Sequence, residues 1–279
     1  MNLVIQGLSP LSATHIATLR QLSVTAGAVK IGKRAIQFPD ADTAHRDAVS
    51  AYCAAQQFDF AYVPEKRLAD FGLLAMDMDS TLITIECIDE IADYCGLKAQ
   101  VSAITEAAMR GEITDFNESL RRRVSLLAGL DAAVLERVYD ERVQLSPGAE
   151  ALIAGVKDAG LATLLVSGGF TFFTERLKKR LGIDEAHANT LEIVNGKLTG
   201  RVLGEIVNGD AKARFVLQAC KRLGIDPSQA IALGDGSNDL PMMAAVGLSG
   251  AFRAKPVVRA GATIALDYVG LDGVLNLFS

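Results

Sequence analysis

The sequence contains no tryptophan, three histidines and four cysteines, and each shortage argues against a class of site. The cysteines form no CxxC pair, and the histidines (His15, His45 and His187) lie far apart along the chain. Neither a disulfide framework nor a Cys/His zinc site is therefore expected. We expect four reduced structural thiols in a cytoplasmic protein.

Long apolar runs and long basic runs are also missing. No apolar stretch reaches the roughly 18 residues that a membrane-spanning helix needs, so we expect no membrane partner. The net charge is −5, and the three arginines at 121–123 are too few for a basic patch. We therefore expect no nucleic-acid partner. The first ten residues lack a basic start and a small-residue cleavage site, so no secretory signal is expected.

Half of the 279 residues are hydrophobic, which is enough for a large core and more than one domain. Residues 1–70 have the pattern of a small α+β domain. Strands are expected at 3–7, 28–38 (with a turn around Gly32) and 58–64, and helices at 11–23 and 42–57. This order is typical of a ferredoxin-like unit in which helices cover one face of a sheet.

Residues 71–279 have a different pattern, in which strands alternate with helices. Strands are expected at 72–77, 161–169 and 230–236, a hairpin at 191–204, and helices at 148–160, 171–182, 211–224 and 238–246. Such alternation predicts an α/β fold with a parallel sheet whose site lies at the carboxyl ends of the strands. About four helices, at 87–145, interrupt the first crossover, where they would lie above those ends as a cap.

Polar side chains end three of the expected parallel strands. Asp77 and Asp79 follow the first strand, Ser167, Gly168 and Gly169 end the second, and Asp235, Asn238 and Asp239 follow the third. Lys212 lies at the start of the intervening helix. Because these strand ends converge, we expect the groups in one small volume, with Asp77 and Asp79 facing the same way on a strand.

Crowded carboxylates need a cation, and oxygen ligands from Asp77 and Asp235 together with waters suit Mg²⁺. The same set suits phosphoryl transfer, which depends on positioning and charge neutralisation. One carboxylate can attack phosphorus, while the second protonates the leaving alkoxide and then deprotonates a water.

The segments DMDST, VSGG and GDGSND, together with Lys212, resemble the four motifs of the haloacid dehalogenase superfamily of aspartate-nucleophile phosphatases. The longer segments DMDSTLITIECIDEIA, SLRRRVSLLAGL, GKLTG and GDGSNDLPM resemble the phosphoserine phosphatase branch, from Gly72 almost to the carboxyl terminus. The resemblance implies a Rossmann-like core with a helical cap, and hydrolysis of O-phospho-L-serine to serine, the last step of serine biosynthesis.

The resemblance also implies the role of each site residue. Asp77 is the expected nucleophile and Asp79 the general acid/base. Mg²⁺ is expected on the side chains of Asp77 and Asp235 and the backbone carbonyl of Asp79, with Asp239 in support. Ser167, Gly168 and Lys212 are expected to bind the phosphoryl group, and Asn238 to order the region. An acid at position 79 favours ester hydrolysis, since members with a long-lived aspartyl-phosphate have threonine there.

Glu86 and Arg123 are the expected ligands of the substrate's ammonium and carboxylate groups. On a helical projection, Arg123 lies beside the apolar stripe of Leu120, Val124 and Leu127, whereas Arg122 points away. A buried arginine needs a partner, which is either the substrate or a cap acid. Glu86 fits equally with a simple helix-dipole role. The family has its substrate-binding residues at both positions, and Met109 and Phe116 match residues that close over the substrate.

Two other hypotheses remain. A phosphatase of the same superfamily could act on another small ester, such as phosphothreonine, phosphohomoserine or phosphocholine. A metabolite-binding protein with an inactive core is the alternative outside enzymes, although the intact set of acids argues against it. Residues 1–70 resemble regulatory ACT domains in element order, from which a homodimer is expected.

Overall fold

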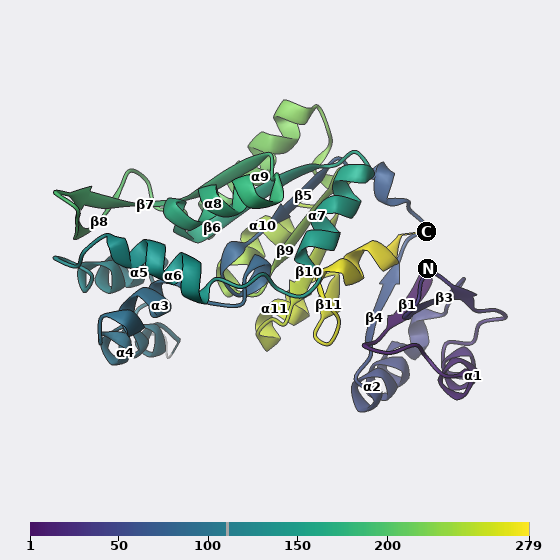
Figure 1. Ribbon diagram of the computed structural model, residues 1–279. Coiled ribbons are helices and arrows are strands. Elements are labelled where there is room, and N and C mark those ends of the chain that lie inside the picture. Colours follow the sequence, from purple (N-terminus) through teal and green to yellow (C-terminus); the bar gives the residue numbers. More distant parts are fainter. Residues whose placement is uncertain (110–111, 279) are drawn as a thin grey trace.

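Figure 1 shows the computed structural model, which describes residues 1–109 and 112–278. The described residues form a four-stranded sheet near the amino terminus and a seven-stranded sheet in the rest of the chain. No helix in these ranges combines the length and the apolar character needed to span a lipid bilayer.

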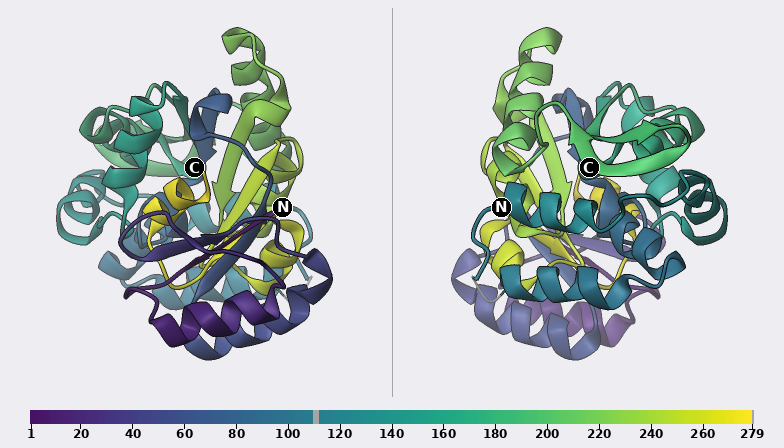
Figure 2. Two further views of the ribbon diagram at one scale, coloured as in Figure 1. Left: turned by 90° about the vertical axis from the view of Figure 1, so that its right-hand side faces the viewer. Right: turned by 90° about the vertical axis from the view of Figure 1, so that its left-hand side faces the viewer.

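The amino-terminal unit has the strand order β2-β3-β1-β4, with all pairs antiparallel. Leu3 and Ile5 point to one side of β1 and pack against the two helices, as the two-residue period of a strand dictates. The left view of Figure 2 shows these helices on the outer side of the sheet. The elements are β1 (Asn2–Gln6), α1 (Ala13–Leu22), β2 (Val29–Lys30), β3 (Ala35–Phe38), α2 (Arg46–Gln56) and β4 (Asp59–Val63).

The other side of this sheet, here called the inner face, consists of Val4, Ala61 and Val63. These side chains join the main hydrophobic core and meet the carboxyl-terminal segment Leu271–Leu277. Both faces of the amino-terminal sheet are thus covered, one by its own helices and one by the rest of the chain.

The large sheet has the order β11-β10-β9-β5-β6-β7-β8, and its strands are parallel except for β8. The central strand β5 therefore lies between β9 and β6, which brings the three polar strand ends side by side. The strands are β5 (Leu73–Met76), β6 (Ala162–Phe170), β7 (Glu185–Val194), β8 (Lys197–Leu203), β9 (Ala230–Gly234), β10 (Leu248–Phe252) and β11 (Ile264–Leu266).

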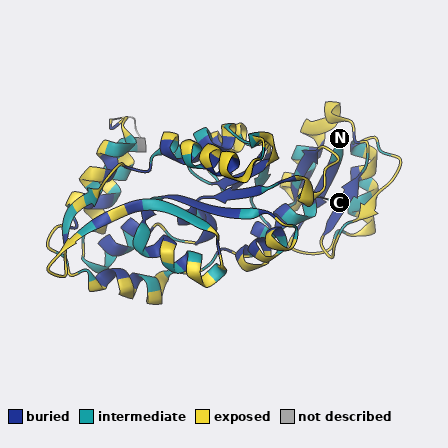
Figure 3. Cartoon of the chain, turned by 90° about the horizontal axis from the view of Figure 1, so that it is seen from above, coloured by how far each residue is buried: buried dark blue, intermediate teal, exposed yellow. Residues whose placement is uncertain are grey.

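Helices cover both faces of this sheet, because alternate strand residues point to opposite sides. Leu74 and Met76 face a core completed by α7 (Ala149–Asp158) and α8 (Thr171–Leu181). Leu73 and Ala75 face a second core built on α9 (Gly209–Leu223), α10 (Leu240–Ala244) and α11 (Pro256–Gly261). Figure 3 shows the resulting buried band along the strands between more exposed helices.

Four of the helices that the structure describes between β5 and β6 form a group next to the β7–β8 hairpin, at the opposite end of the molecule from the amino-terminal unit (Figure 1). They are α3 (Cys87–Tyr94), α4 (Lys98–Met109), α5 (Phe116–Ser125) and α6 (Ala133–Arg142). The expected end of the second helix at Gly111 lies outside the described residues.

The strands β10 and β11 were not expected from the sequence. The segment of β10, LSGAF, contains a serine, a glycine and an alanine, so its strand preference is weak. Its pairing with β9 makes it a strand, and Gly250 lets it pack against Leu233.

Candidate active site

The strand β5 ends at Met76, and Asp77 and Asp79 lie just beyond it, so the expectation that both lie on the strand is wrong. The Asp77 N–H still donates to the Leu233 carbonyl of β9, at 3.0 Å. The chain then turns sharply at Ser80, whose φ is +57°. This turn buries Met78 and leaves both carboxylates on the cavity side.

Lys212 joins two carboxylates beneath the site. Its Nζ donates to Asp77 Oδ1 at 2.7 Å and to Asp239 Oδ1 at 2.6 Å, and the side chain is 0% exposed. Burial alone would lower the pKa of Lys212, but Asp239 and Asp77 outweigh it and raise that pKa. Lys212 is therefore a fixed positive charge behind Asp77.

Asp239 is held by the backbone of the loop that follows β9. Its Oδ2 accepts the N–H groups of Asp235 and Gly236, at 3.1 and 3.0 Å. Because its Oδ1 is bonded to Lys212, both oxygens of Asp239 already have partners. Asp239 therefore orders the loop that carries Asp235 and Asn238.

Asp235 stands beside Asp77 at the mouth of the site. Its Oδ1 accepts a hydrogen bond from Thr81 Oγ1, at 3.1 Å. Burial raises the pKa of Asp235 to about 7, and repulsion from Asp239 and Glu86 adds to the effect. Burial and the neighbouring Asp239 also raise the pKa of Asp77 well above its usual value. These carboxylates thus carry more negative charge than Lys212 alone can balance.

The donor atoms fit a hard divalent cation. Oxygens of Asp77, Asp235 and Asp239 all lie within 4.8 Å of one another. A cation bound among these carboxylates would relieve the repulsion that raises their pKa values, and carboxylate oxygens are the ligands that such ions prefer. Asp79 was expected to bind the metal through its backbone carbonyl. In agreement with a role of the backbone alone, its side chain is not part of this cluster.

Asp79 lies on the other side of the turn from Asp77. Its Oδ1 accepts the Cys87 N–H at 3.2 Å, at the start of α3. Burial raises the pKa of Asp79 to about 7, with a further contribution from Glu86, although the Cys87 hydrogen bond opposes both. A carboxyl group with this pKa can give or take a proton near neutral pH.

The VSGG segment at the end of β6 is held by hydrogen bonds to its polar groups. Ser167 Oγ accepts the Gly169 N–H at 2.8 Å, and Asn189 Nδ2 donates to the Gly168 carbonyl at 2.8 Å. Asn189 Oδ1 also accepts the Val207 N–H at 2.9 Å. Asn189 was not predicted from the sequence, because nothing in its local pattern separates it from other strand residues.

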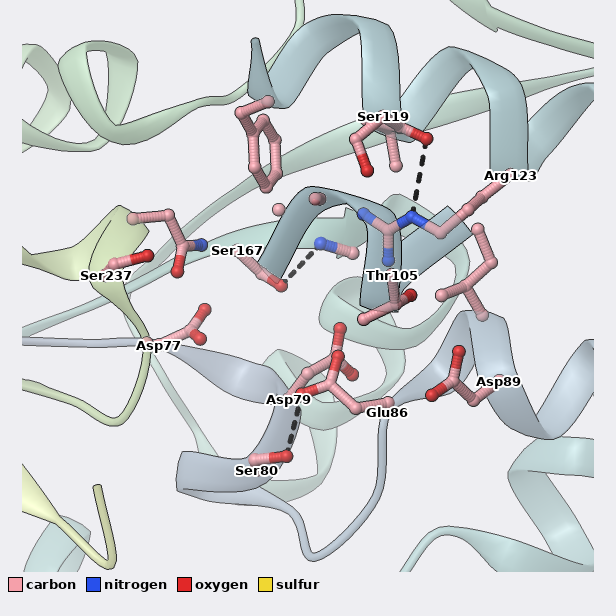
Figure 4. Close-up of a pocket in the computed structure, with 18 of the residues that line it drawn as sticks. Asp77, Asp79, Ser80, Glu86, Asp89, Thr105, Ser119, Arg123, Ser167 and Ser237 are labelled. Atoms are coloured by element: carbon pink, nitrogen blue, oxygen red, sulfur yellow. Dashed lines mark hydrogen bonds between the residues drawn. The ribbon is translucent and has the colours of Figure 1, made fainter. Parts of the chain in front are cut away.

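The start of α3 and the helix α5 supply further side chains of the site. Glu86 is the residue before α3, and its Oε1 accepts a hydrogen bond from Ser80 Oγ at 2.7 Å. Arg123 on α5 is half-buried, and its Nε donates to the Ser119 carbonyl at 3.4 Å. Burial lowers the pKa of Arg123, and the negative charge of Asp89 opposes this most strongly. Figure 4 shows Arg123 reaching toward Glu86 and Asp89 across the pocket.

These groups surround a cavity of about 510 Å³ between the strand ends and the helices α3 to α5. The expected site residues on its wall are Asp77, Asp79, Glu86, Arg123, Ser167, Gly168, Asp235 and Asn238. Lys212 does not line the cavity, but it bonds to Asp77, which does. Phe116 also lines it, whereas the side chain of Met109 lies outside the described part of the structure.

Several residues in or next to the cavity wall were not expected from the sequence. Thr81 is not part of the wall, but it donates a hydrogen bond to Asp235. Its place as the last residue of the DMDST motif was the signal that could have identified it. Asp89, Ser119 and Lys255 belong to the wall. Asp89 lies one helical turn after Glu86, a spacing that places both acids at the same end of α3.

Comparisons with known proteins agree with this geometry. The haloacid dehalogenase-like hydrolase family matches residues 74–244, and a domain of unknown function matches residues 3–49. A phosphoserine phosphatase from Polaromonas sp. is 56% identical over 218 residues, which are 77% of this chain and 92% of that protein.

Solved structures agree as well. A HAD family hydrolase from Salmonella enterica serovar Typhi has a TM-score of 0.89 at 33% identity, covering 100% of this chain and 99% of that one. A phospho-aspartyl intermediate analogue of phosphoserine phosphatase has a TM-score of 0.70 at 38% identity, covering 77% of this chain and 100% of that one. The chain therefore belongs to the haloacid dehalogenase-like hydrolase family and, within it, to the phosphoserine phosphatases.

Proposed function

We propose that the protein hydrolyses O-phospho-L-serine to L-serine and phosphate in a Mg²⁺-dependent reaction, the last step of serine biosynthesis. One observation carries the proposal: Asp77 and Asp79 line the same cavity as Glu86 and Arg123. The first pair suits phosphoryl transfer, and the second pair suits the ammonium and carboxylate of an amino acid.

In the first step, a carboxylate oxygen of Asp77 attacks phosphorus, and the bond between phosphorus and the serine oxygen breaks. Asp79, protonated at the start, gives its proton to that leaving oxygen. Its pKa of about 7 supports this role, since a carboxyl group with an ordinary pKa would hold little proton near neutral pH.

In the second step, the same Asp79 carboxylate takes a proton from water. The water oxygen attacks the phosphorus of the Asp77 phosphate, which restores the Asp77 carboxylate and releases phosphate. The Lys212 ammonium, 2.7 Å from Asp77 Oδ1, favours the charged form of Asp77 and orients its carboxylate between turnovers.

The side chains of Asp77 and Asp235 and the backbone carbonyl of Asp79 would hold the metal, with Asp239 in support. A bound Mg²⁺ would supply positive charge to the phosphoryl oxygens and lower the repulsion between the acids. Ser167, Gly168 and Lys212 are proposed to bind the phosphoryl group, with Asn238 ordering the loop beside them.

Phosphate release from phosphoserine in the presence and absence of Mg²⁺ tests the proposal. Asp77→Asn should abolish turnover, and mass spectrometry of acid-quenched wild-type protein should find the phosphate on Asp77. Asp47→Asn, an exposed acid of α2, is the matched control and should keep full activity. Phosphate trapped on another side chain, or no turnover of phosphoserine, would contradict the assignment.

Arg123→Ala tests the substrate class. A lost bidentate contact to the substrate carboxylate should cost on the order of 2–3 kcal/mol in kcat/KM for phosphoserine. Arg122→Ala is the matched control, because Arg122 is exposed and pairs with Glu118 on the same helix. An unchanged preference for phosphoserine over a plain alkyl phosphate would favour another small phosphate ester as substrate.

The division of the chain is also part of this proposal. We propose residues 1–70 as an ACT-like regulatory or oligomerisation domain and residues 71–279 as the catalytic domain, with the cap at 87–145. The covered inner face supports pairing of two copies through sheet edges or helices in a homodimer. Sedimentation that finds only monomer would contradict it. A cytoplasmic location is supported by the four cysteines, all of which are free.

A further inference from the structure

One acid of the cavity wall, Asp89, has a carboxylate oxygen without a partner. Asp89 lies in the first turn of α3, and its Oδ1 is buried. Among the side chains that the structure describes, this is the only buried nitrogen or oxygen without a hydrogen-bond partner. Buried polar atoms are nearly always paired, because an unpaired one loses its hydration without replacement. The position of Asp89 therefore requires an explanation.

The ordinary structural roles of an acid at this position do not explain it. An acid three residues after the start of a helix often accepts the first N–H of that helix, but Asp89 Oδ1 accepts no such bond. A favourable interaction with the helix dipole also does not explain the burial of Asp89 Oδ1, because an exposed acid has the same interaction. Glu90 also lies in the first turn of α3, and its carboxylate pairs with Arg142 at 3.0 Å.

The surroundings of Asp89 point to a positively charged ligand. Glu86 and Asp89 approach the cavity from the same end of α3, and Arg123 faces them from α5 (Figure 4). Among the described residues, no ion pair within 4.0 Å involves Arg123, and the cavity separates it from the two acids. Glu86 already accepts the Ser80 hydroxyl at 2.7 Å. An ammonium group, with three N–H donors, needs more acceptors than Glu86 alone offers.

We propose that Asp89 is a specificity-determining residue that accepts a hydrogen bond from the substrate ammonium group beside Glu86. The inference rests on the proposed function, since it assigns one more ligand to the amino-acid part of the same substrate. Glu86 and Asp89 then hold the ammonium from two sides, while Arg123 holds the carboxylate. A phosphate ester without an ammonium group leaves two neighbouring carboxylates unpaired, so the pocket selects against it.

Three substrates separate this role from others. Phosphoserine carries both groups, O-phosphoethanolamine carries the ammonium alone, and 3-(phosphonooxy)propanoate carries the carboxylate alone. For Asp89→Asn, we expect kcat/KM to fall roughly 10- to 100-fold for phosphoserine and phosphoethanolamine, mainly through KM. The value for 3-(phosphonooxy)propanoate should stay the same or rise, because a charge that repels its carboxylate is removed.

Glu90→Gln is the matched control, since Glu90 belongs to the same helical turn and lies outside the cavity wall. It should leave all three values unchanged. A loss confined to the two carboxylate-bearing substrates would mean that Asp89 orients Arg123, and it would overturn the proposal. Equal losses on all three substrates would indicate a structural role and would also overturn it.

Thermal unfolding of the free protein adds an independent readout. Because Asp89 Oδ1 has no partner in the free protein, Asp89→Asn should unfold at the same temperature as wild type or a higher one. A lower unfolding temperature with equal losses on every substrate would overturn the proposal. If wild-type protein releases no phosphate from phosphoserine, the proposed function fails and the inference with it. If the wild type hydrolyses phosphoserine but Asp89→Asn does not lose activity selectively on the two ammonium-bearing substrates, the inference is overturned and the proposed function stands.

Discussion

Gly169 and Asp79 lie so close that no side chain fits between them. A Cβ atom on Gly169 would overlap Asp79 Oδ2 and would lie 2.8 Å from Met78 Cε. The second glycine of the VSGG segment thus leaves the space in which the proposed general acid stands. The glycine matters here for its small size, since its φ lies outside the left-handed region.

Gly169→Ala should therefore displace the Asp79 carboxylate and lower kcat for phosphoserine by on the order of 100-fold, the cost of misplacing a catalytic group by about 1 Å. Steady-state kinetics measure it. Gly27→Ala is the matched control, because a Cβ there meets nothing within 4 Å. A variant with normal kcat would show that Asp79 has more room than the structure allows.

Asp79→Asn should separate the two chemical steps. With phosphoserine, whose leaving alkoxide needs a proton, kcat should fall roughly 10²- to 10⁴-fold. With p-nitrophenyl phosphate, whose leaving group needs none, the first step should keep most of its rate and the second should become limiting. Stopped-flow absorbance should then show a burst of nitrophenolate. Equal losses on both substrates without a burst would contradict the assignment of Asp79.

Removing divalent metal should make stability depend on pH in an unusual direction. The folded-state pKa values of Asp79 and Asp235 are about 7, above the 3.8 of an ordinary aspartate. Below pH 7 the folded protein therefore binds protons that the unfolded chain does not. In EDTA, the free energy of unfolding should rise as pH falls from 8 to 6, by on the order of 1 kcal/mol per group.

Urea denaturation at several pH values measures this dependence. Added Mg²⁺ should stabilise the protein most above pH 7 and progressively less below it, because protons compete for the same oxygens. The control is Asp235→Asn in EDTA, which should show a weaker rise because one titrating group is gone. A metal-free protein whose stability falls between pH 8 and 6 would contradict the raised pKa values.

Asp59 ties the amino-terminal unit to the rest of the chain. It is 3% exposed, and its two oxygens accept the backbone N–H groups of Asp267, Tyr268 and Val269 at 2.8 to 3.0 Å. Asp59→Ala would leave three donors without a partner and should lower the free energy of unfolding by about 3–5 kcal/mol.

Denaturant unfolding of Asp59→Ala next to Asp47→Ala, an exposed acid of α2, tests this role. Activity at low temperature should be unchanged, because β4 lies at the opposite end of the molecule from the cap helices (Figure 1). If Asp59→Ala does not fold, Asp59→Asn keeps one acceptor and should lose less. Equal stability of the two alanine variants would show that Asp59 is not an anchor.

The parts of the site that were predictable depend on short-range rules. Asp77 and Asp235 follow strands that the apolar pattern identifies, and Ser167 lies near the end of another. Parallel topology then brings the strand ends together. Arg123 was assigned to the inner side of α5 from the helical period. In the structure it is half-buried, whereas Arg121 and Arg122 are exposed.

Long-range partners were not predictable. The hydrogen bonds of Asp59 reach a segment about two hundred residues away. Asn189 bonds to the Gly168 carbonyl in β6 and to the Val207 N–H just before α9. The sequence around Asp59 and around Asn189 has the pattern of an ordinary strand, so it gives no sign of these distant partners. The strands β10 and β11 likewise depend on neighbours in the sheet more than on their own composition, which is why their segments carried little signal.

The inner face of the amino-terminal sheet also has a consequence for synthesis on the ribosome. Asp59 emerges 208 residues before Asp267, which at 5–20 residues per second is a delay of roughly 10 to 40 s. During that delay Val4, Ala61 and Val63 have no cover from the segment Leu271–Leu277. The amino-terminal unit is therefore made well before the segment that covers its inner face, and the nascent sheet has an apolar face without that cover.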